Sequence, residues 1–202
     1  GDPSAHAVCF AENGAAHVSV YHLTIEKTHF LHPKLPSNDF AWEQISAVAE
    51  ALGKRGFHHY EISNFALPGQ ESRNNTNYWR SGPYWALGPS ASGFDGNARR
   101  WKNVADWEEY VRRLMRGESP VAETESLTQE QRGIEALFTS FRTSRGLDLT
   151  WFRENFGQDL AVSRKTLFAT LEKDGLGALA NGHFVLTFRG RMLADEIVRR
   201  II

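Results

Sequence analysis

The order of strand-like and helix-like segments between residues 17 and 63 most constrains the fold of this chain. Residues 17–25 are rich in β-branched and aromatic side chains, with apolar residues in both alternating phases, as in a strand buried on both faces. Residues 40–55 repeat apolar side chains at helical spacing and stop before Gly56, and residues 57–63 have the composition of a second strand. This order predicts a βαβ unit, and therefore an α/β fold with a parallel sheet and a right-handed crossover.

The character of the sequence changes after Gly117. Residues 118–125 are typical of a polar connector, and Thr128-Gln-Glu-Gln131 beyond it predicts a helix with a capping box. Further helical patterns follow, then Asn181-Gly182 between two apolar runs, which predicts a β-hairpin, and a last helix from about Arg189. Helices, hairpin and helix together predict a small winged-helix-like domain. We therefore place a boundary near residue 122, between domains 1–122 and 123–202.

Charge and hydropathy exclude several classes of protein. The formal net charge is −1, from 23 Lys and Arg against 24 Asp and Glu residues, so the chain lacks the positive field typical of nucleic-acid binding. No apolar run approaches the roughly 18 residues of a membrane-spanning helix, and no charged-then-apolar leader opens the chain. These features predict a cytoplasmic protein without a membrane span.

Cysteine and histidine placement argues against a metal site. Cys9 is the one cysteine, whereas an iron–sulfur cluster takes about four sulfur ligands. We expect Cys9 to be buried as a small apolar residue. His58 and His59 are neighbours on a predicted strand, so they point to opposite faces and cannot bind one ion together. No residue pattern indicates a catalytic triad, a phosphate-binding loop or paired catalytic acids.

The densest group of amide, hydroxyl and aromatic side chains lies between Tyr60 and Trp79. Glu61, Ser63 and Asn64 fall at the predicted carboxyl end of a parallel strand, where α/β proteins bind ligands. Residues 87–94 form a second segment of small residues that allows the close approach of a ligand or of another backbone.

Each of these features also has a purely structural interpretation. The side chains around Pro68-Gly69 can close Asx-type turns in an ordinary loop. Glu61 can be a site carboxylate or the strand-end partner of an arginine. Gly88 and Gly93 can serve close packing of elements rather than ligand contact. The residues alone leave these alternatives open.

Four segments resemble a known family, in the same order. They are Leu23-Thr-Ile-Glu26, Tyr60–Ala66 with Pro68-Gly69 after it, Asn75-Thr-Asn-Tyr-Trp79, and Leu87-Gly-Pro-Ser-Ala91. They resemble the later half of radical SAM proteins of the oxygen-independent coproporphyrinogen III oxidase-like family, with its HemW haem-chaperone branch. From about residue 125, the chain resembles that family's small C-terminal domain.

The resemblance implies the C-terminal part of a partial (β/α) barrel that works in haem or porphyrin metabolism. The intact family members would bind S-adenosylmethionine and a 4Fe–4S cluster, the latter through a CxxxCxxC motif that this sequence does not contain. We therefore expect a fragment that is inert without a cluster-binding half and that holds no cofactor by itself, although haem binding is conceivable. The alternatives are a true coproporphyrinogen III oxidase, or an interaction or nucleic-acid-binding module.

The resemblance also implies a set of cofactor-binding residues. They are Glu61, Ser63, Asn64, Arg73, Asn74, Asn75, Tyr78, Trp79, Gly88, Ser90 and Ala91. Arg73 suits a porphyrin carboxylate, Tyr78 and Trp79 suit a flat macrocycle, and the backbone of residues 87–94 suits S-adenosylmethionine. Family members carry histidines at the positions of Asn74 and Ser92, and amide or hydroxyl groups are poor ligands for haem iron.

The expected partners follow from the same resemblance. They are a porphyrin or haem and a haem-accepting client protein. Basic residues of the predicted winged-helix-like domain could contact phosphates, but acidic residues interleave with them, so we expect no nucleic acid. A half barrel would leave a sheet edge uncovered, which predicts a homodimer through that edge.

Overall fold

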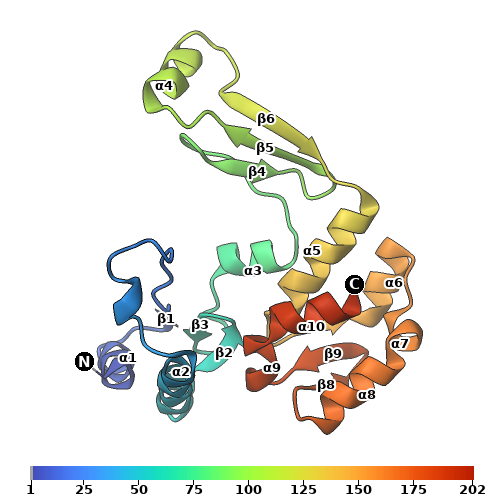
Figure 1. Ribbon diagram of the computed structural model, residues 1–202. Helices are drawn as coiled ribbons and strands as arrows, with labels where there is room; N and C mark the ends of the chain where they lie inside the picture. The colour runs from blue at the N-terminus through green and yellow to red at the C-terminus, as the bar shows by residue number, and fades with distance from the viewer. Residues whose placement is uncertain (1) are drawn as a thin grey trace. The chain divides into compact units, whose positions relative to one another are not determined.

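The computed structural model describes residues 2–202, except for the side chain of Asn38. The chain divides into two compact units, one ending at Ser72 and the other spanning Arg73–Ile202. Each unit has its own sheets and helices (Figure 1), and each is described by itself below.

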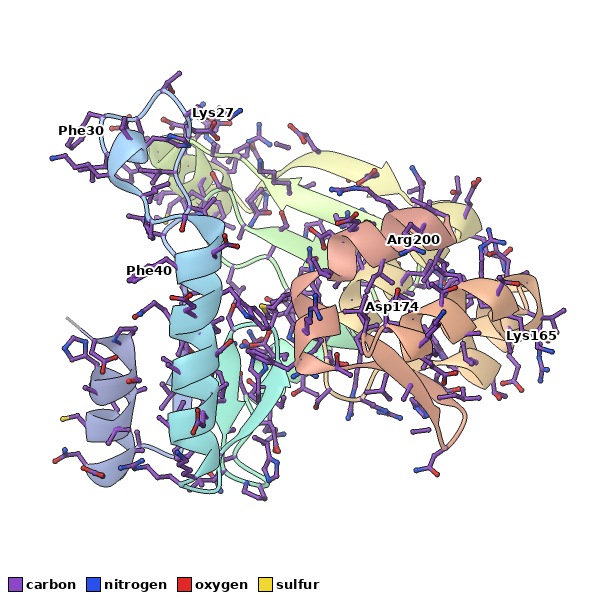
Figure 2. All side chains as sticks on the ribbon, turned by 60° about the horizontal axis from the view of Figure 1, so that its bottom comes forward. Lys27, Phe30, Phe40, Lys165, Asp174 and Arg200 are labelled. Carbon is purple, nitrogen blue, oxygen red and sulfur yellow. The ribbon has the colours of Figure 1, made fainter. Side chains whose placement is uncertain are left out.

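The first unit contains two longer helices and three short strands. Its elements are α1 (Pro3–Glu12), β1 (His17–Ser19), the 3-10 helix η1 (His32–Lys34), α2 (Asn38–Gly53), β2 (His58–Glu61) and β3 (Asn64–Ala66). Asp2 caps α1 and Ser37 caps α2, each through a side chain that accepts a backbone N–H. The two helices lie side by side (Figures 1 and 2). Val48, Leu52 and Phe65 are buried in the core.

The predicted parallel sheet is wrong, because β3 lies between the two strands that were expected to pair. The sheet order is β1-β3-β2, and both pairs are antiparallel. β1 and β2, which come before and after α2 in the sequence, therefore run in the same direction. Each of them is hydrogen-bonded to β3 and not to the other. A tight turn at Ile62 and Ser63 reverses the chain directly after β2. The first strand is also shorter than the predicted 17–25, ending at Ser19.

Part of the apolar surface of the first unit points outward. Phe30, in the loop after β1, is 78% exposed, and Phe40 on α2 is 49% exposed; both side chains extend away from the ribbon in Figure 2. Cys9 is exposed on α1, which corrects the expectation that it is buried.

The second unit begins with α3 (Arg73–Trp79) and an antiparallel sheet. The sheet order is β4 (Ser92–Phe94), β5 (Arg99–Asn103) and β6 (Val121–Ser126), with α4 (Trp107–Met115) between β5 and β6. The polar connector expected at residues 118–125 is mostly β6. Most of its side chains are exposed, so no apolar alternation marks it in the sequence. Residue 122, near which the sequence analysis places a domain boundary, lies within β6, and the division into domains 1–122 and 123–202 stays a prediction.

The remaining residues form helices around a second small sheet. The elements are α5 (Gln129–Phe141), β7 (Leu147–Asp148), α6 (Leu149–Phe156), α7 (Leu160–Ser163), α8 (Lys165–Lys173), β8 (Gly177–Ala180), β9 (His183–Leu186), α9 (Phe188–Met192) and α10 (Ala194–Ile201). The strand order is β7-β9-β8. Phe141, Phe152 and Phe184 are buried in its core. The order of helices followed by a hairpin agrees with the predicted winged-helix-like domain.

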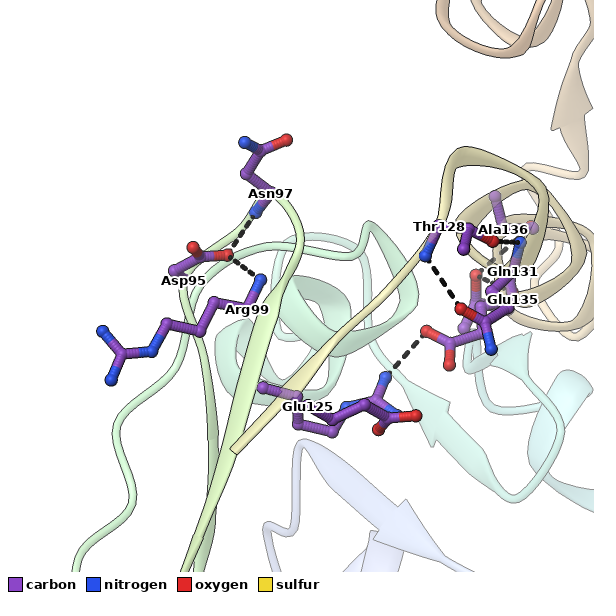
Figure 3. Close-up of polar contacts among 10 residues, drawn as sticks. Asp95, Asn97, Arg99, Glu125, Thr128, Gln131, Glu135 and Ala136 are labelled. Atoms are coloured by element: carbon purple, nitrogen blue, oxygen red, sulfur yellow. Dashed lines mark hydrogen bonds and ion pairs between the residues drawn. The ribbon is translucent and has the colours of Figure 1, made fainter. Parts of the chain in front are cut away.

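Two local predictions in this region are confirmed. The hydroxyl of Thr128 accepts the N–H of Gln131 at 3.2 Å, and the N–H of Thr128 donates to the Gln131 side chain at 2.8 Å (Figure 3). Asn181 and Gly182 both have positive φ, at 50° and 80°, as a two-residue hairpin turn requires. Within the described residues, no helix combines the length and apolar character that crossing a bilayer requires.

Candidate functional site

Glu61, Ser63 and Asn64 meet at the turn between β2 and β3. Asn64 Nδ2 donates to Glu61 Oε1, and the Ser63 N–H donates to the same oxygen at 3.4 Å. The hydroxyl of Ser19 on β1 donates to Asn64 Oδ1. Glu61 and Asn64 are 1% and 2% exposed. The structure thus brings these predicted site residues together in a network that ties all three strands, with Glu61 and Asn64 buried, Ser63 partly open to solvent and Ser19 exposed.

A second network, centred on Tyr60, was not anticipated. The Tyr60 hydroxyl lies 2.9 Å from His17 Nε2 and accepts the N–H of Ser72 at 3.3 Å. The two rings also meet edge to face, with centroids 5.8 Å apart. Sequence reasoning could not find this pairing, because the residues are 43 positions apart and the antiparallel register that aligns their strands was not predicted.

Helix α3, in the second unit, carries five of the predicted site residues. They are Arg73, Asn74, Asn75, Tyr78 and Trp79. Arg73 and Asn74 are exposed, and Tyr78 is 42% exposed. The Tyr78 ring packs edge-on against Tyr84, with centroids 4.7 Å apart. α3 therefore offers a supported aromatic ring and a guanidinium to a ligand.

Trp79 is less accessible than Tyr78. Its Nε1 is buried and has no hydrogen-bond partner among the described residues. A buried indole N–H usually has a partner. The indole ring is therefore part of the packing of α3, and its N–H group lacks a hydrogen-bond acceptor among the described residues.

The loop that contains Gly88, Ser90 and Ala91 is fixed by hydrogen bonds within its own unit. Gly88 has φ +103°, which glycine adopts without strain. Its N–H donates to the Tyr110 hydroxyl at 3.1 Å. Asn103, 2% exposed, donates Nδ2 to the carbonyls of Ala86 at 3.1 Å and Gly88 at 3.0 Å. Helix α4 is capped by Asp106 rather than by Asn103.

The backbone donors of this loop are already used. The N–H of Ser90 donates to Val104 at 2.9 Å, and that of Ala91 donates to Gly88 at 3.4 Å. Pro89 has no N–H to offer. A ligand at this loop would therefore meet the exposed Ser90 side chain and carbonyl oxygens rather than free N–H groups.

Two charged groups near this sheet have shifted pKa values. Two backbone N–H groups, of Asn97 and Arg99, donate to the Asp95 carboxylate at 2.8 and 3.0 Å (Figure 3). These bonds, that of Asn97 foremost, lower the pKa of Asp95. Partial burial is the largest single effect on Arg100 and lowers its pKa, but the 2.7 Å hydrogen bond to Glu135 on α5 and the attraction of Glu135, Tyr84 and Glu125 together raise the pKa.

Comparison with known proteins places these features in a family. Residues 127–193 match the family model described as the HemN C-terminal domain. The haem chaperone HemW of Mycobacterium tuberculosis is 34% identical over 196 residues, which cover 94% of this chain and 48% of that protein. HemW of Bacillus subtilis is 31% identical over 192 residues, covering 91% and 50%.

The chain is thus similar to HemW haem chaperones over most of its length, and its C-terminal part matches the HemN C-terminal domain. It spans about half the length of the curated relatives it matches. A solved structure titled as coproporphyrinogen III oxidase (HemN) from Escherichia coli, a radical SAM enzyme, superimposes with a TM-score of 0.69 over 96% of this chain and 49% of that chain. At 18% sequence identity, this likeness shows the fold, which is the predicted α/β class.

The residues of this chain do not fit an iron–sulfur cluster. Its single cysteine, Cys9, is exposed on α1. In the described part of the chain, no three His, Cys, Asp or Glu side chains gather in a way that could hold a metal ion. We therefore derive no step through a cluster.

Histidine ligation of haem iron has no support on α3. The position of the family histidine is Asn74, and the one histidine between residues 73 and 202 is His183. His183 lies on β9, with Nε2 3.7 Å from Asp148 Oδ2. A porphyrin at α3 would therefore be held by its ring and carboxylates.

A separate cavity lies in the C-terminal domain. It encloses about 610 Å³ between α5, α6, α7 and the end of α10. Its walls include Leu137, Phe152 and Ile201, with Arg164 at one side. None of the predicted site residues lines it.

Proposed function

We propose that this chain handles haem or a closely related porphyrin, as a member of the HemW branch of its family. The observation that carries the proposal is the similarity to haem chaperones over 94% of the chain, at 34% identity. The fold match to coproporphyrinogen III oxidase agrees with a tetrapyrrole ligand but does not by itself assign one.

The surface of α3 supports this function through ring and carboxylate contacts. Tyr78 presents a ring that Tyr84 holds from the side, and aromatic rings stack well on flat macrocycles. Arg73 is exposed at the start of the same helix, five residues before Tyr78, where its guanidinium can pair with a propionate. Because neither contact involves iron, binding should not depend on the metal.

The proposal also includes expectations about cofactors, a partner protein and the cellular location. We expect S-adenosylmethionine and a cluster to be bound only together with cysteine ligands that this sequence does not supply. We also expect a client protein that accepts haem, and a location in the cytoplasm. Oxidative decarboxylation of coproporphyrinogen III is the second candidate; the chain as given is expected to show none.

Absorbance titration tests the proposal with a matched pair of ligands. Adding haem to the 202-residue chain should shift the Soret band, and iron-free protoporphyrin should bind with a Kd within about threefold of haem. The variant Tyr78→Ala should weaken both ligands similarly. Trp151→Ala is the control, because Trp151 is a partly exposed aromatic residue on α6.

Two results would count against the proposal. The absence of any haem or porphyrin binding would refute haem handling by this chain. Binding of haem with no binding of protoporphyrin would instead show that the iron is ligated, contrary to the mode proposed here.

A further inference from the structure

The sheet β4-β5-β6 has two faces of different chemistry. In an antiparallel pair, residues directly opposite one another lie on the same face, and neighbours along a strand alternate. Trp101 is opposite both Gly93 and Thr124, and Arg99 is opposite Ser126. We call this side the tryptophan face. The other side, the charged face, carries Phe94, Arg100, Lys102, Glu123 and Glu125.

The basic residue Arg100 on the charged face has its interaction partners within the protein. Arg100 bonds to Glu135 at 2.7 Å and lies 3.8 Å from Glu125. Its guanidinium also lies over the Phe94 ring, 6.0 Å from the centroid. The acidic side chains of β6 are thus balanced by bases on the same face.

The tryptophan face is built around a glycine. A Cβ at Gly93 would lie 2.3 Å from atoms of the Trp101 ring, so only glycine lets that ring lie across β4. The Trp85 ring meets Trp101 edge to face, with centroids 6.5 Å apart. Trp85 and Leu87 are each 83% exposed. Trp85 and Leu87 thus expose apolar surface beside the half-buried Trp101, which is typical of a binding surface.

Arg99 is the basic residue of this face, and β6 places Thr124 and Ser126 here. The Arg99 guanidinium makes no ion pair or hydrogen bond that is recorded among the described residues, and it extends away from the hairpin (Figure 3). Asp95 lies opposite Arg99, but its Oδ1 is bonded to the backbone N–H groups of Asn97 and Arg99 rather than to the guanidinium.

We infer that the tryptophan face binds a flat tetrapyrrole, with Trp85 and Trp101 contacting the ring and Arg99 contacting a carboxylate. The inference rests on the proposed function and adds a second contact surface. It differs from the α3 surface because Tyr84, the neighbour of Trp85, packs against both Phe94 and Tyr78 on the charged side of the sheet.

Two variants of the whole chain test the inference. Trp85→Ala should weaken haem binding roughly five- to tenfold, the usual value of an exposed aromatic stacking contact. Trp107→Ala, which removes another exposed tryptophan, should change the Kd less than twofold. Trp85→Phe should restore most of the affinity, because the ring is retained.

Arg99→Gln separates the carboxylate contact from the ring contact. It should weaken haem about threefold or more, consistent with an exposed charge pair, and leave haem dimethyl ester unaffected. Arg116→Gln is the control, since Arg116 is an exposed arginine at the end of α4.

The outcomes distinguish this inference from the proposed function. If Trp85→Ala binds haem like Trp107→Ala while Tyr78→Ala loses binding, the tryptophan face is refuted and haem handling stands. Equal loss of haem and its ester in Arg99→Gln would also refute the carboxylate contact. If the unaltered chain binds neither ligand, both proposals fail.

Discussion

Asn103 shows how a single side chain can set the shape of a candidate binding loop. Its buried amide holds the carbonyls of Ala86 and Gly88, and its own N–H donates to Ala91 at 2.9 Å. Glycine at position 88 supplies the unusual φ, and Asn103 supplies the bonds that keep the loop there. Gly88 stands out in the sequence, but Asn103 does not, because the two carbonyls that it bonds lie 17 and 15 positions away.

Asn103→Ala should therefore destabilise the protein. Two carbonyls would lose their donor, at a cost of about 1–3 kcal/mol in the free energy of unfolding. Urea unfolding followed by circular dichroism would measure the change. Asn97→Ala is the matched control, because Asn97 is exposed at a hairpin; equal effects from the two variants would contradict the role of Asn103.

At the scale of elements, helix α5 is the clearest case in which the local sequence determines where an element begins. Its first turn is closed by reciprocal bonds between Thr128 and Gln131. It follows β6 directly and bonds back to β5 through Glu135. The cap sets where α5 begins and the ion pair joins it to β5, while Ala136, Leu137 and Phe141 pack it into the core.

Thr128→Ala should lower the free energy of unfolding by about 1 kcal/mol, since it removes the acceptor for a helix N-terminal N–H. Thermal unfolding would report the loss as a reduced Tm. Thr150→Ala provides the comparison, because Thr150 is exposed and lies inside α6 rather than at its cap. An unchanged Tm for Thr128→Ala would show that the box does not limit stability.

Short-range signals were predictable from the sequence, and strand pairing was not. The capping box and the Asn181-Gly182 turn involve residues only a few positions apart, so both can be recognised from the sequence alone. β3 was missed because Asn64-Phe-Ala66 is too short to show a period, and its presence converts a parallel sheet into an antiparallel one. The same limit applies to the candidate site: Glu61 and Asn64 could be singled out from the sequence, but the Trp85–Trp101 pair depends on a register that the sequence does not display.

At the scale of the whole molecule, the chain corresponds to about half of its curated relatives. The outer strands of the first sheet, β1 and β2, each pair with β3 alone among the described strands. Unpaired strand edges favour association with other chains. We therefore retain the proposal of a homodimer through a sheet edge.

Light scattering over a range of protein concentrations should show a dimer that dissociates on dilution. His58→Lys should lower the dimer fraction, because His58 is an exposed residue of the outer strand β2 and a charge on an edge strand opposes pairing. Gln70→Lys adds the same charge at an exposed position outside the strands. A monomer at every concentration would refute the dimer.

The cavity of the C-terminal domain has a practical consequence for such experiments. Ile201 and Ile202 form part of its wall, and Arg164 Nε donates to the Ile201 carbonyl at 2.7 Å. A purification tag or fluorescent protein fused after Ile202 would start at the rim of this cavity and could shield it from added ligands. A fusion placed before α1 leaves Ile201 and Ile202 unchanged, and is the better choice of handle for studying this domain.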